Sequence, residues 1–346
     1  MTESDALAES NAQTRGKPDV VLLGDGITAS SALQSLVASC NVVRVIRASP
    51  TGPSDPVYKF ANTLGIPVSS LAGLDELARL IADIKPSVVV ISSFNLILPP
   101  SILSMCRFVN VHYSLLPSYR GRANVNWAVI NGEVATGITI HLVAPALDGG
   151  NVLFQEAVPI MPDDTVTSLY ERLNAIQLRE LGTAVVRAAL GDPGNPQNPE
   201  EATFGCARIA ADGEIDWTQT SLAIDRLIRA LTPPFPGAFT HLDMEKLVIA
   251  RASPRLNPPT YAGRIPGRIV GRSAAEGWVD VLTGDGVMRL FEVAVAPLTG
   301  APCSAAAVIR STRSSLGLSR LDLLRRITTL EDRLVKIERL GATRIQ

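Results

Sequence analysis

Short apolar runs separated by amphipathic stretches fill the first half of the chain. Runs rich in valine, isoleucine and leucine, typical of buried strands, occupy residues 19–24, 41–46 and 87–93. Apolar residues recur at helical spacing in residues 29–38 and 74–86, and a proline closes the second of these stretches. Unbroken apolar strands that alternate with helices predict a parallel sheet with helices on both faces. We therefore expect an α/β domain.

The pattern changes after a segment rich in turn-forming residues. Residues 191–202 hold three prolines, two glycines and two asparagines, which is typical of a linker between domains. Short strand-like runs follow at residues 267–272, 277–283 and 287–295, with a Gly-Asp-Gly turn before the last one. The expected fold is a Rossmann-like, largely parallel sheet domain, then a small barrel-like (OB-like) β domain and a C-terminal amphipathic helix. The expected divisions are a disordered tail (1–18), the α/β domain (19–190), the linker (191–202), the barrel-like domain (203–310) and the helix region (311–346).

The end of the chain carries a short heptad repeat. Leu323, Ile327, Leu330, Leu334 and Ile337 follow one another at spacings of four and three residues, and charged residues fill the other faces. A helix this short is barely stable alone in water, so its apolar stripe must pack on something. We expect homodimerisation, with docking on its own chain as the alternative.

Composition narrows the class of protein. The chain has 346 residues, 46% of them hydrophobic, which is enough for a globular core. No apolar run approaches the ~18 residues of a membrane span, and the polar first residues do not resemble a signal peptide. The four cysteines (Cys40, Cys106, Cys206 and Cys303) lack metal-ligand spacing. We expect reduced thiols in a cytoplasmic protein without a membrane partner.

Charge is divided unevenly along the chain. Residues 1–204 hold 13 lysines and arginines against 19 aspartates and glutamates, whereas the remainder holds 19 against 14. A mildly basic second half suits an anionic ligand, but it falls short of the charge typical of nucleic-acid binding.

Candidate chemistry lies at the end of one strand. Asn110 and His112 are two residues apart in the strand-like run 107–113, so they share a face near its carboxyl end, where parallel sheets bind ligands. Asp148 lies in a loop of sequence ALDGG. Each residue alone is more typical of a structural role, and the set lacks a third ligand for a metal.

Taken together, three segments resemble a known family. "NVHYSLLPSYRGRANVNWAVINGE", "TGITIHLVAPALDGG" and "TVTSLYERL" are similar to the 10-formyltetrahydrofolate-dependent formyltransferases. The shared pattern is Asn-x-His, Ser-Leu-Leu-Pro, Arg-Gly, Thr-Gly-x-Thr and a loop aspartate, in matching order and spacing. Weaker resemblance runs from about Val20 to Leu298, and the tail after about Pro302 has no counterpart.

The resemblance implies a formyltransferase that moves a formyl group from N10-formyltetrahydrofolate, as co-substrate, to a primary amine without a metal. It implies catalytic roles for Asn110, His112 and Asp148. The amide and a protonated imidazole would donate to the oxyanion that forms when the amine attacks, and the carboxylate would relay the proton of the amine.

The resemblance also implies residues that hold the folate. Those assigned to the pterin slot are Phe94, Leu96, Ile97, Leu98 and Ala144, and those that shape the site beside it are Ser114, Leu115, Leu116 and Pro117. Ordinary loop packing remains an equal alternative for the pterin slot. His141 is expected to be structural.

Three further residues are expected to contact the acceptor. Arg120 and Arg122 would flank the mouth of the pocket and bind phosphate, with solvated turn arginines as the alternative. Asn124 stands where close relatives usually have proline, so acceptor choice is expected to differ there.

The acceptor itself is inferred from finer resemblance. The region 47–68 lacks the basic insertion usual in transfer-RNA formyltransferases, which argues against a nucleic-acid partner. The segments around residues 118–133 and 215–239 are more similar to enzymes acting on UDP-4-amino-4-deoxy-arabinose. We therefore expect a nucleotide-linked amino sugar as the small-molecule substrate. The alternatives are a methionyl-tRNA formyltransferase, a formyltetrahydrofolate hydrolase and a non-catalytic binding protein.

Overall fold

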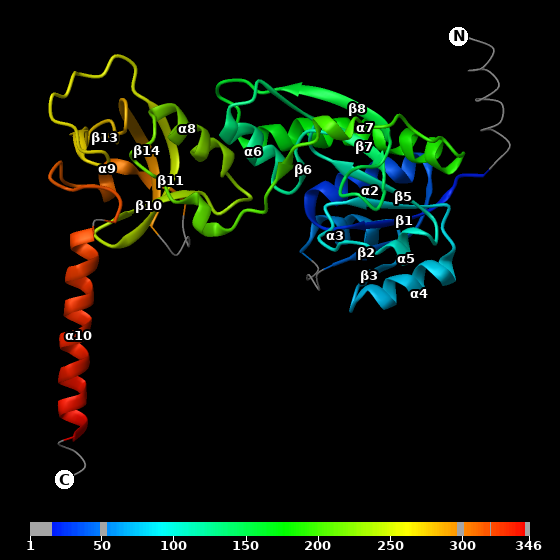
Figure 1. Ribbon diagram of the computed structural model, residues 1–346, viewed down its shortest axis with the longest axis horizontal. Helices are drawn as coiled ribbons and strands as arrows, with labels where there is room; N and C mark the ends of the chain where they lie inside the picture. The colour runs from blue at the N-terminus through cyan, green and yellow to red at the C-terminus, as the bar shows by residue number, and fades with distance from the viewer. Residues whose placement is uncertain (1–15, 49–53, 296–300, 319, 343–346) are drawn as a thin grey trace. The chain divides into compact units, whose positions relative to one another are not determined.

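The computed structural model describes residues 16–48, 54–295, 301–318 and 320–342. It forms two compact units. The first comprises residues up to Ala128 together with Glu133–Arg208, and the second comprises Val129–Gly132 and the chain from Ile209 onward (Figure 1). Most of the tail expected to be disordered, residues 1–15, lies outside the described residues.

The first unit is built on a seven-stranded sheet with the order β3-β2-β1-β4-β5-β7-β8. Its first five strands run parallel, and the last two are antiparallel to their neighbours. Buried valine and leucine side chains fill β1 and β4, as their unbroken apolar sequences predict, and Ile91 of β4 is half-buried. The strands are β1 (Asp19–Gly24), β2 (Asn41–Arg47), β3 (Val68–Ser70), β4 (Val88–Ser92), β5 (Arg107–His112), β7 (Ala135–Leu142) and β8 (Val152–Pro159).

Helices cover both faces of this sheet (Figure 1). On one face α2 packs against α7, where the Gly182 amide donates to Ser35 Oγ at 3.0 Å. On the other face α4 and α5 bury Leu77, Ile81 and Ile102 against the strands. A capping box formed by Thr165 and Ser168 begins α7. The helices are α2 (Gly26–Ser39), α3 (Pro56–Thr63), α4 (Leu74–Ile84), α5 (Pro100–Leu103), α6 (Asn124–Asn131) and α7 (Val166–Ala189).

The segment 191–202, expected to link two domains, packs within the first unit. Asn195 bridges to Val152 of β8, and a 3-10 turn follows at Pro199–Glu201. The strand β9 (Phe204–Gly205) then pairs with β6 (Arg120–Gly121). The prolines and glycines here therefore belong to an irregular segment of the first unit, not to a linker between the two units.

The second unit is an antiparallel sheet with the order β10-β11-β14-β13-β12, and β15 pairs with β14. Leu316 bridges to Leu242 and Ser315 bridges to Arg268, so one segment joins the two ends of the sheet as in a small barrel. The elements are α8 (Ser221–Ala230), β10 (Ala238–Leu242), β11 (Glu245–Pro254), β12 (Ile269–Arg272), β13 (Val279–Leu282), β14 (Val287–Val295), β15 (Cys303–Ser304), α9 (Ala305–Val308) and α10 (Arg320–Ala342).

All four cysteines are free thiols, and burial raises the pKa of Cys40 and Cys106 to about 11. Within the described ranges, no helix is both long and apolar enough to cross a membrane. The described His, Cys, Asp and Glu side chains likewise form no group of three or more able to hold a metal ion.

Candidate active site

The pairing of β5 with β7 places four polar side chains at one end of the sheet. Asn110 lies opposite His141, and His112 lies opposite Thr139. Asp148 belongs to the loop between β7 and β8 and adopts a left-handed φ of 47°. A Cβ on Gly150 would lie 1.7 Å from the carbonyl oxygen of Leu142, so only glycine lets this loop return so closely to β7.

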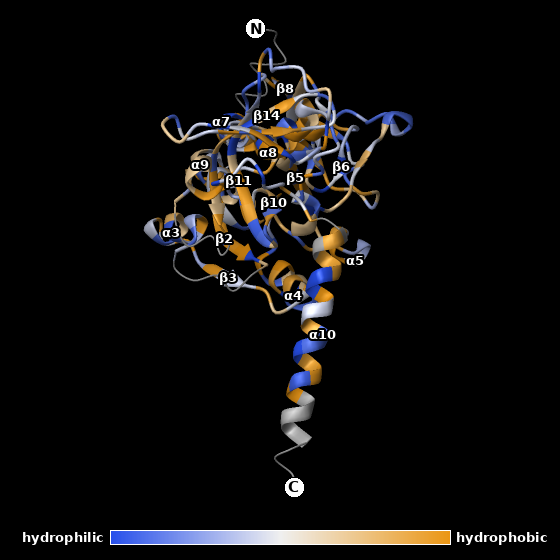
Figure 2. Cartoon of the chain, turned by 90° about the vertical axis from the view of Figure 1, so that its left-hand side faces the viewer, coloured by the Kyte–Doolittle hydropathy of each residue, from blue (hydrophilic) through white to orange (hydrophobic). Residues whose placement is uncertain are grey.

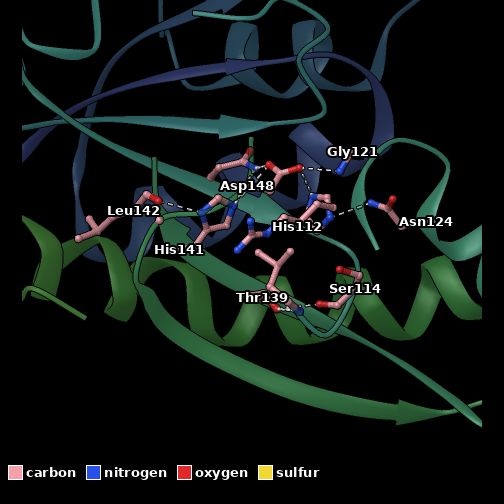
Figure 3. A network of polar contacts seen from close by, with 12 residues as sticks. His112, Ser114, Gly121, Asn124, Thr139, His141, Leu142 and Asp148 are labelled. Atoms are coloured by element: carbon pink, nitrogen blue, oxygen red, sulfur yellow. Dashed lines mark hydrogen bonds and ion pairs between the residues drawn. The ribbon is translucent and has the colours of Figure 1, made fainter. Parts of the chain in front are cut away.

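The carboxylate of Asp148 lies beside His112 (Figure 3) and also contacts Asn110. Its Oδ2 lies 3.6 Å from His112 Nδ1 and accepts from the Gly121 amide at 2.8 Å. Its Oδ1 accepts from Asn110 Nδ2 at 3.5 Å, the outer limit of a hydrogen bond. The structure thus brings Asn110, His112 and Asp148 together.

The other nitrogen of His112 faces oxygen atoms. Nε2 lies 2.8 Å from the carbonyl oxygen of Tyr119 and 2.9 Å from the side-chain amide of Asn124. With the amide oriented to satisfy all its partners, Oδ1 of Asn124 accepts from Nε2 and Nδ2 donates to the carbonyls of Tyr119 and Arg122. Because both neighbours of Nε2 accept, this nitrogen carries a proton. Asn124, expected to contact the acceptor, contacts His112 in this structure, and its contact with the acceptor stays a prediction.

His141 is part of the same network. Its Nδ1 lies 2.8 Å from the carbonyl oxygen of Leu142 and must donate to it. Burial, followed by the neighbouring His112, lowers the pKa of His141 to about 4, so the ring is neutral near pH 7. Nε2 is then a lone-pair acceptor, and Asn110 Nδ2 donates to it at 3.1 Å. One N–H of the Asn110 amide is therefore held in place, and the other points toward Asp148.

Arg120 and Gln197 hold the Asp148 loop from outside. Nε2 of Gln197 donates to the carbonyls of Asp148 and Gly150, both at 2.7 Å. Arg120 donates to Gln197 Oε1 at 2.7 Å, and only 7% of Arg120 is exposed. Arg120 was expected to flank the mouth of the substrate pocket. In the structure its guanidinium is instead buried beneath the Asp148 loop.

Arg122 is the exposed member of the expected arginine pair, and it donates to Asn95 Oδ1 at 2.7 Å. Because Arg122 is exposed, its guanidinium is accessible to an anionic group of a substrate.

Thr139 fixes the loop that follows β5 (Figure 3). Its hydroxyl donates to the Ser114 carbonyl at 2.7 Å and accepts from the Leu116 amide at 3.2 Å. Gln155 donates to the Leu116 carbonyl at 2.8 Å. A pocket of about 520 Å³ opens on this side of the first unit. Its lining residues are Leu116, Pro117, Val152, Leu153, Phe154, Gln155, Asn195, Pro196, Gln197 and Asn198.

The residues expected in the pterin slot divide into three groups by burial. Leu98 is buried in the apolar core beside α4, and Phe94 packs against that core. Leu96 and Ile97 are exposed at 40% and 83%, so their apolar surface is available to a ligand. Ala144 is half-buried at the start of the loop that contains Asp148.

Comparison with known proteins matches both units. The family model "Formyl transferase" matches residues 43–185, and "Formyl transferase, C-terminal domain" matches residues 209–313. A methionyl-tRNA formyltransferase of Heliobacterium modesticaldum is 34% identical over 86% of this chain and 98% of its own length. That of Marinobacter nauticus is 33% identical over 78% of this chain and 89% of its own length.

Solved structures show the same fold. HypX from Aquifex aeolicus in complex with tetrahydrofolic acid matches with a TM-score of 0.60 at 16% identity. The match covers 86% of this chain, which spans about half the length of HypX (48%). The identity over both units, together with the matched motifs around Asn110, His112 and Asp148, places the chain in the 10-formyltetrahydrofolate-dependent formyltransferase family.

Proposed function

We propose that this enzyme formylates the amino group of methionyl-tRNA, with N10-formyltetrahydrofolate as the formyl donor. The observation that carries this acceptor is the identity of 33–34% to two methionyl-tRNA formyltransferases across both units. The second unit also presents exposed cations, among them Arg264, Arg310 and Arg313, to which phosphates can bind. The relatives thus favour transfer RNA over the nucleotide-linked amino sugar expected from the sequence.

The geometry of Asn110 supports a role in stabilising the oxyanion. When the amine attacks the formyl carbon, a C–N bond forms and the carbonyl electron pair moves onto oxygen. His141 holds one N–H of Asn110, whereas the other makes only the 3.5 Å contact with Asp148. This second N–H is available to the oxyanion at little cost. One such donor contributes roughly 10²–10³ in rate.

The carboxylate of Asp148 supports a role in proton relay. The attacking amine must lose a proton, and N10 of the folate must gain one as its bond to the formyl carbon breaks. Asp148 lies beside both Asn110 and His112 and is oriented by the Gly121 amide. Donation by His112 to the oxyanion requires that its bond to the Tyr119 carbonyl be exchanged for one to substrate. The folate would contact the exposed apolar faces of Leu96 and Ile97.

A nucleotide-linked amino sugar is the second candidate acceptor. The observation that favours it is the burial and ion pairing of Arg47. This residue begins the region 47–68, which lacks a basic insertion, and it is only 1% exposed. It pairs with Asp25 and Asp55, each at 2.9 Å. Arg47 is therefore not available to phosphates of a nucleic acid.

An acceptor comparison tests the proposal. The full-length enzyme is incubated with formyltetrahydrofolate and either methionyl-tRNA or UDP-4-amino-4-deoxy-arabinose, and formylated product is measured by mass. We expect formyl-methionyl-tRNA, formed at a rate that falls as salt rises because phosphate contacts are screened. Formylation of the amino sugar alone would overturn the proposal. Folate turnover without any amine would identify a hydrolase.

A further inference from the structure

The helix α10 exposes an apolar stripe to solvent. The helix has 23 residues, and Leu323, Ile327, Leu330, Leu334 and Ile337 are each between 40% and 66% exposed. Figure 2 shows apolar and polar bands alternating along it. Exposed apolar side chains that alternate at spacings of four and three, here over just over two heptads, are typical of a coiled-coil seam.

The stripe needs a partner, because a helix of this length gains little stability from its own hydrogen bonds in water. The heptad repeat assigns Ile327 and Leu334 to a positions and Leu323, Leu330 and Ile337 to d positions. A second copy supplies the same seam, so a and d side chains of the two helices can fill one another's holes.

The flanking charges select the orientation of that second copy. Arg326 occupies a g position, and Glu331, five residues later, occupies the following e position. Arg333 and Glu338 repeat this pair in the sequence one heptad on. In a parallel, in-register pair each g residue faces the following e residue of its partner, which joins arginine to glutamate. An antiparallel pair would set arginine against arginine and glutamate against glutamate, which is repulsive.

We propose that the enzyme is a homodimer in which two α10 helices form a parallel, in-register coiled coil. Two interhelical Arg326–Glu331 pairs, one on each side, flank the seam. This assembly uses residues far in sequence from the catalytic centre and does not depend on the identity of the acceptor.

Charge reversal in the full-length protein tests the pairing. An acidic variant carries Arg326→Glu and Arg333→Glu, and a basic variant carries Glu331→Arg and Glu338→Arg. Each variant has like charges at every g–e contact of its homodimer. We expect the dissociation constant of each homodimer to rise about tenfold or more. Mixing the two should restore dimers, now made of one chain of each kind, in native mass spectrometry. Two variants that stay dimeric alone, or fail to combine when mixed, would overturn the proposal.

Cysteine cross-linking tests the orientation. In a chain carrying Cys206→Ser and Cys303→Ser, Leu323→Cys places a thiol at a d position, which faces itself only in a parallel pair. We expect a disulfide-linked dimer on mild oxidation, and none from the matched control Asp332→Cys, on the outer f face. A monomeric wild type in light scattering, or absence of the Leu323→Cys cross-link, would contradict the parallel coil.

Discussion

The register of the β5–β7 pair determines which residues contact the side-chain amide of Asn110. His141 lies directly across the β5–β7 pair and accepts one N–H, so the second N–H has a fixed direction. Asn110→Ala removes this donor while leaving the backbone pairing intact. We expect kcat to fall by on the order of 10²–10³ with KM for the folate changed only a few-fold. The exposed Asn62→Ala serves as the matched control, and normal turnover by Asn110→Ala would exclude the amide from catalysis.

Neutral His141 makes a distinct prediction about pH. Its pKa is lowered by burial to about 4 in the fold, so between about pH 6.5 and pH 4 the unfolded chain binds one proton more than the folded chain. Stability therefore falls as pH falls through this window, by at most about 1.4 kcal/mol per pH unit. His141→Gln should flatten this slope in chemical denaturation. It should also keep more activity than His141→Leu, because the Gln oxygen can still accept from Asn110.

Equal pH slopes for wild type and His141→Gln would contradict a neutral, buried His141. Equal activity of the Gln and Leu variants would show that the acceptor at this position does not orient Asn110.

Asn124 has a role that the sequence did not indicate. It stands at the start of α6, and its amide holds the Nε2 side of the His112 ring. Asn124→Ala should lower kcat about fivefold, in keeping with one lost hydrogen bond of about 1 kcal/mol, without changing KM for the acceptor. A selective rise in acceptor KM would instead support the expectation that Asn124 binds the acceptor.

At the level of elements, apolar patterning predicted the sheet well because its strands are buried on both faces. The runs at 19–24, 41–46 and 87–93 correspond to β1, β2 and β4. The pairing of Asn110 with His112 on one face also followed from strand geometry alone. The chain segments around the catalytic residues carry specific motifs, so the family could be identified from sequence.

The support of the Asp148 loop could not be predicted in the same way. Gln197 lies 49 positions from Asp148 in a segment without regular spacing, and its two bonds are to backbone carbonyls. Backbone acceptors leave no residue-type signal in a sequence. The same holds for Arg120, whose burial depends on Gln197 and the return of residues 195–205 to the first unit.

Gln197→Ala tests whether this segment positions the loop. Two hydrogen bonds to the loop are lost, and we expect kcat to fall about tenfold while the folate dissociation constant stays within a few-fold. The exposed Asn198→Ala in the same segment is the matched control. Equal activity of both variants would show that the Asp148 loop holds its geometry without Gln197.

At the level of the whole molecule, two units with separate folds serve one reaction. The first contains the proposed catalytic residues, and the matches to two methionyl-tRNA formyltransferases extend over the second as well. The total charge of −1 is the sum of an acidic part, residues 1–204, and a basic remainder. Phosphates bind to arginines that are exposed on the folded surface, and these arginines need not form a basic run in the sequence.

The most direct test of the account is the initial rate of formyl-methionyl-tRNA synthesis by wild type and by Asp148→Asn, with folate binding measured on both. Asp148→Asn keeps the shape of the side chain but removes its charge and its ability to take a proton. We predict product from the wild type, a rate at least about 100-fold lower from the variant, and folate affinity within a few-fold. No product from folded wild type, or an equal rate from the variant, would contradict the account.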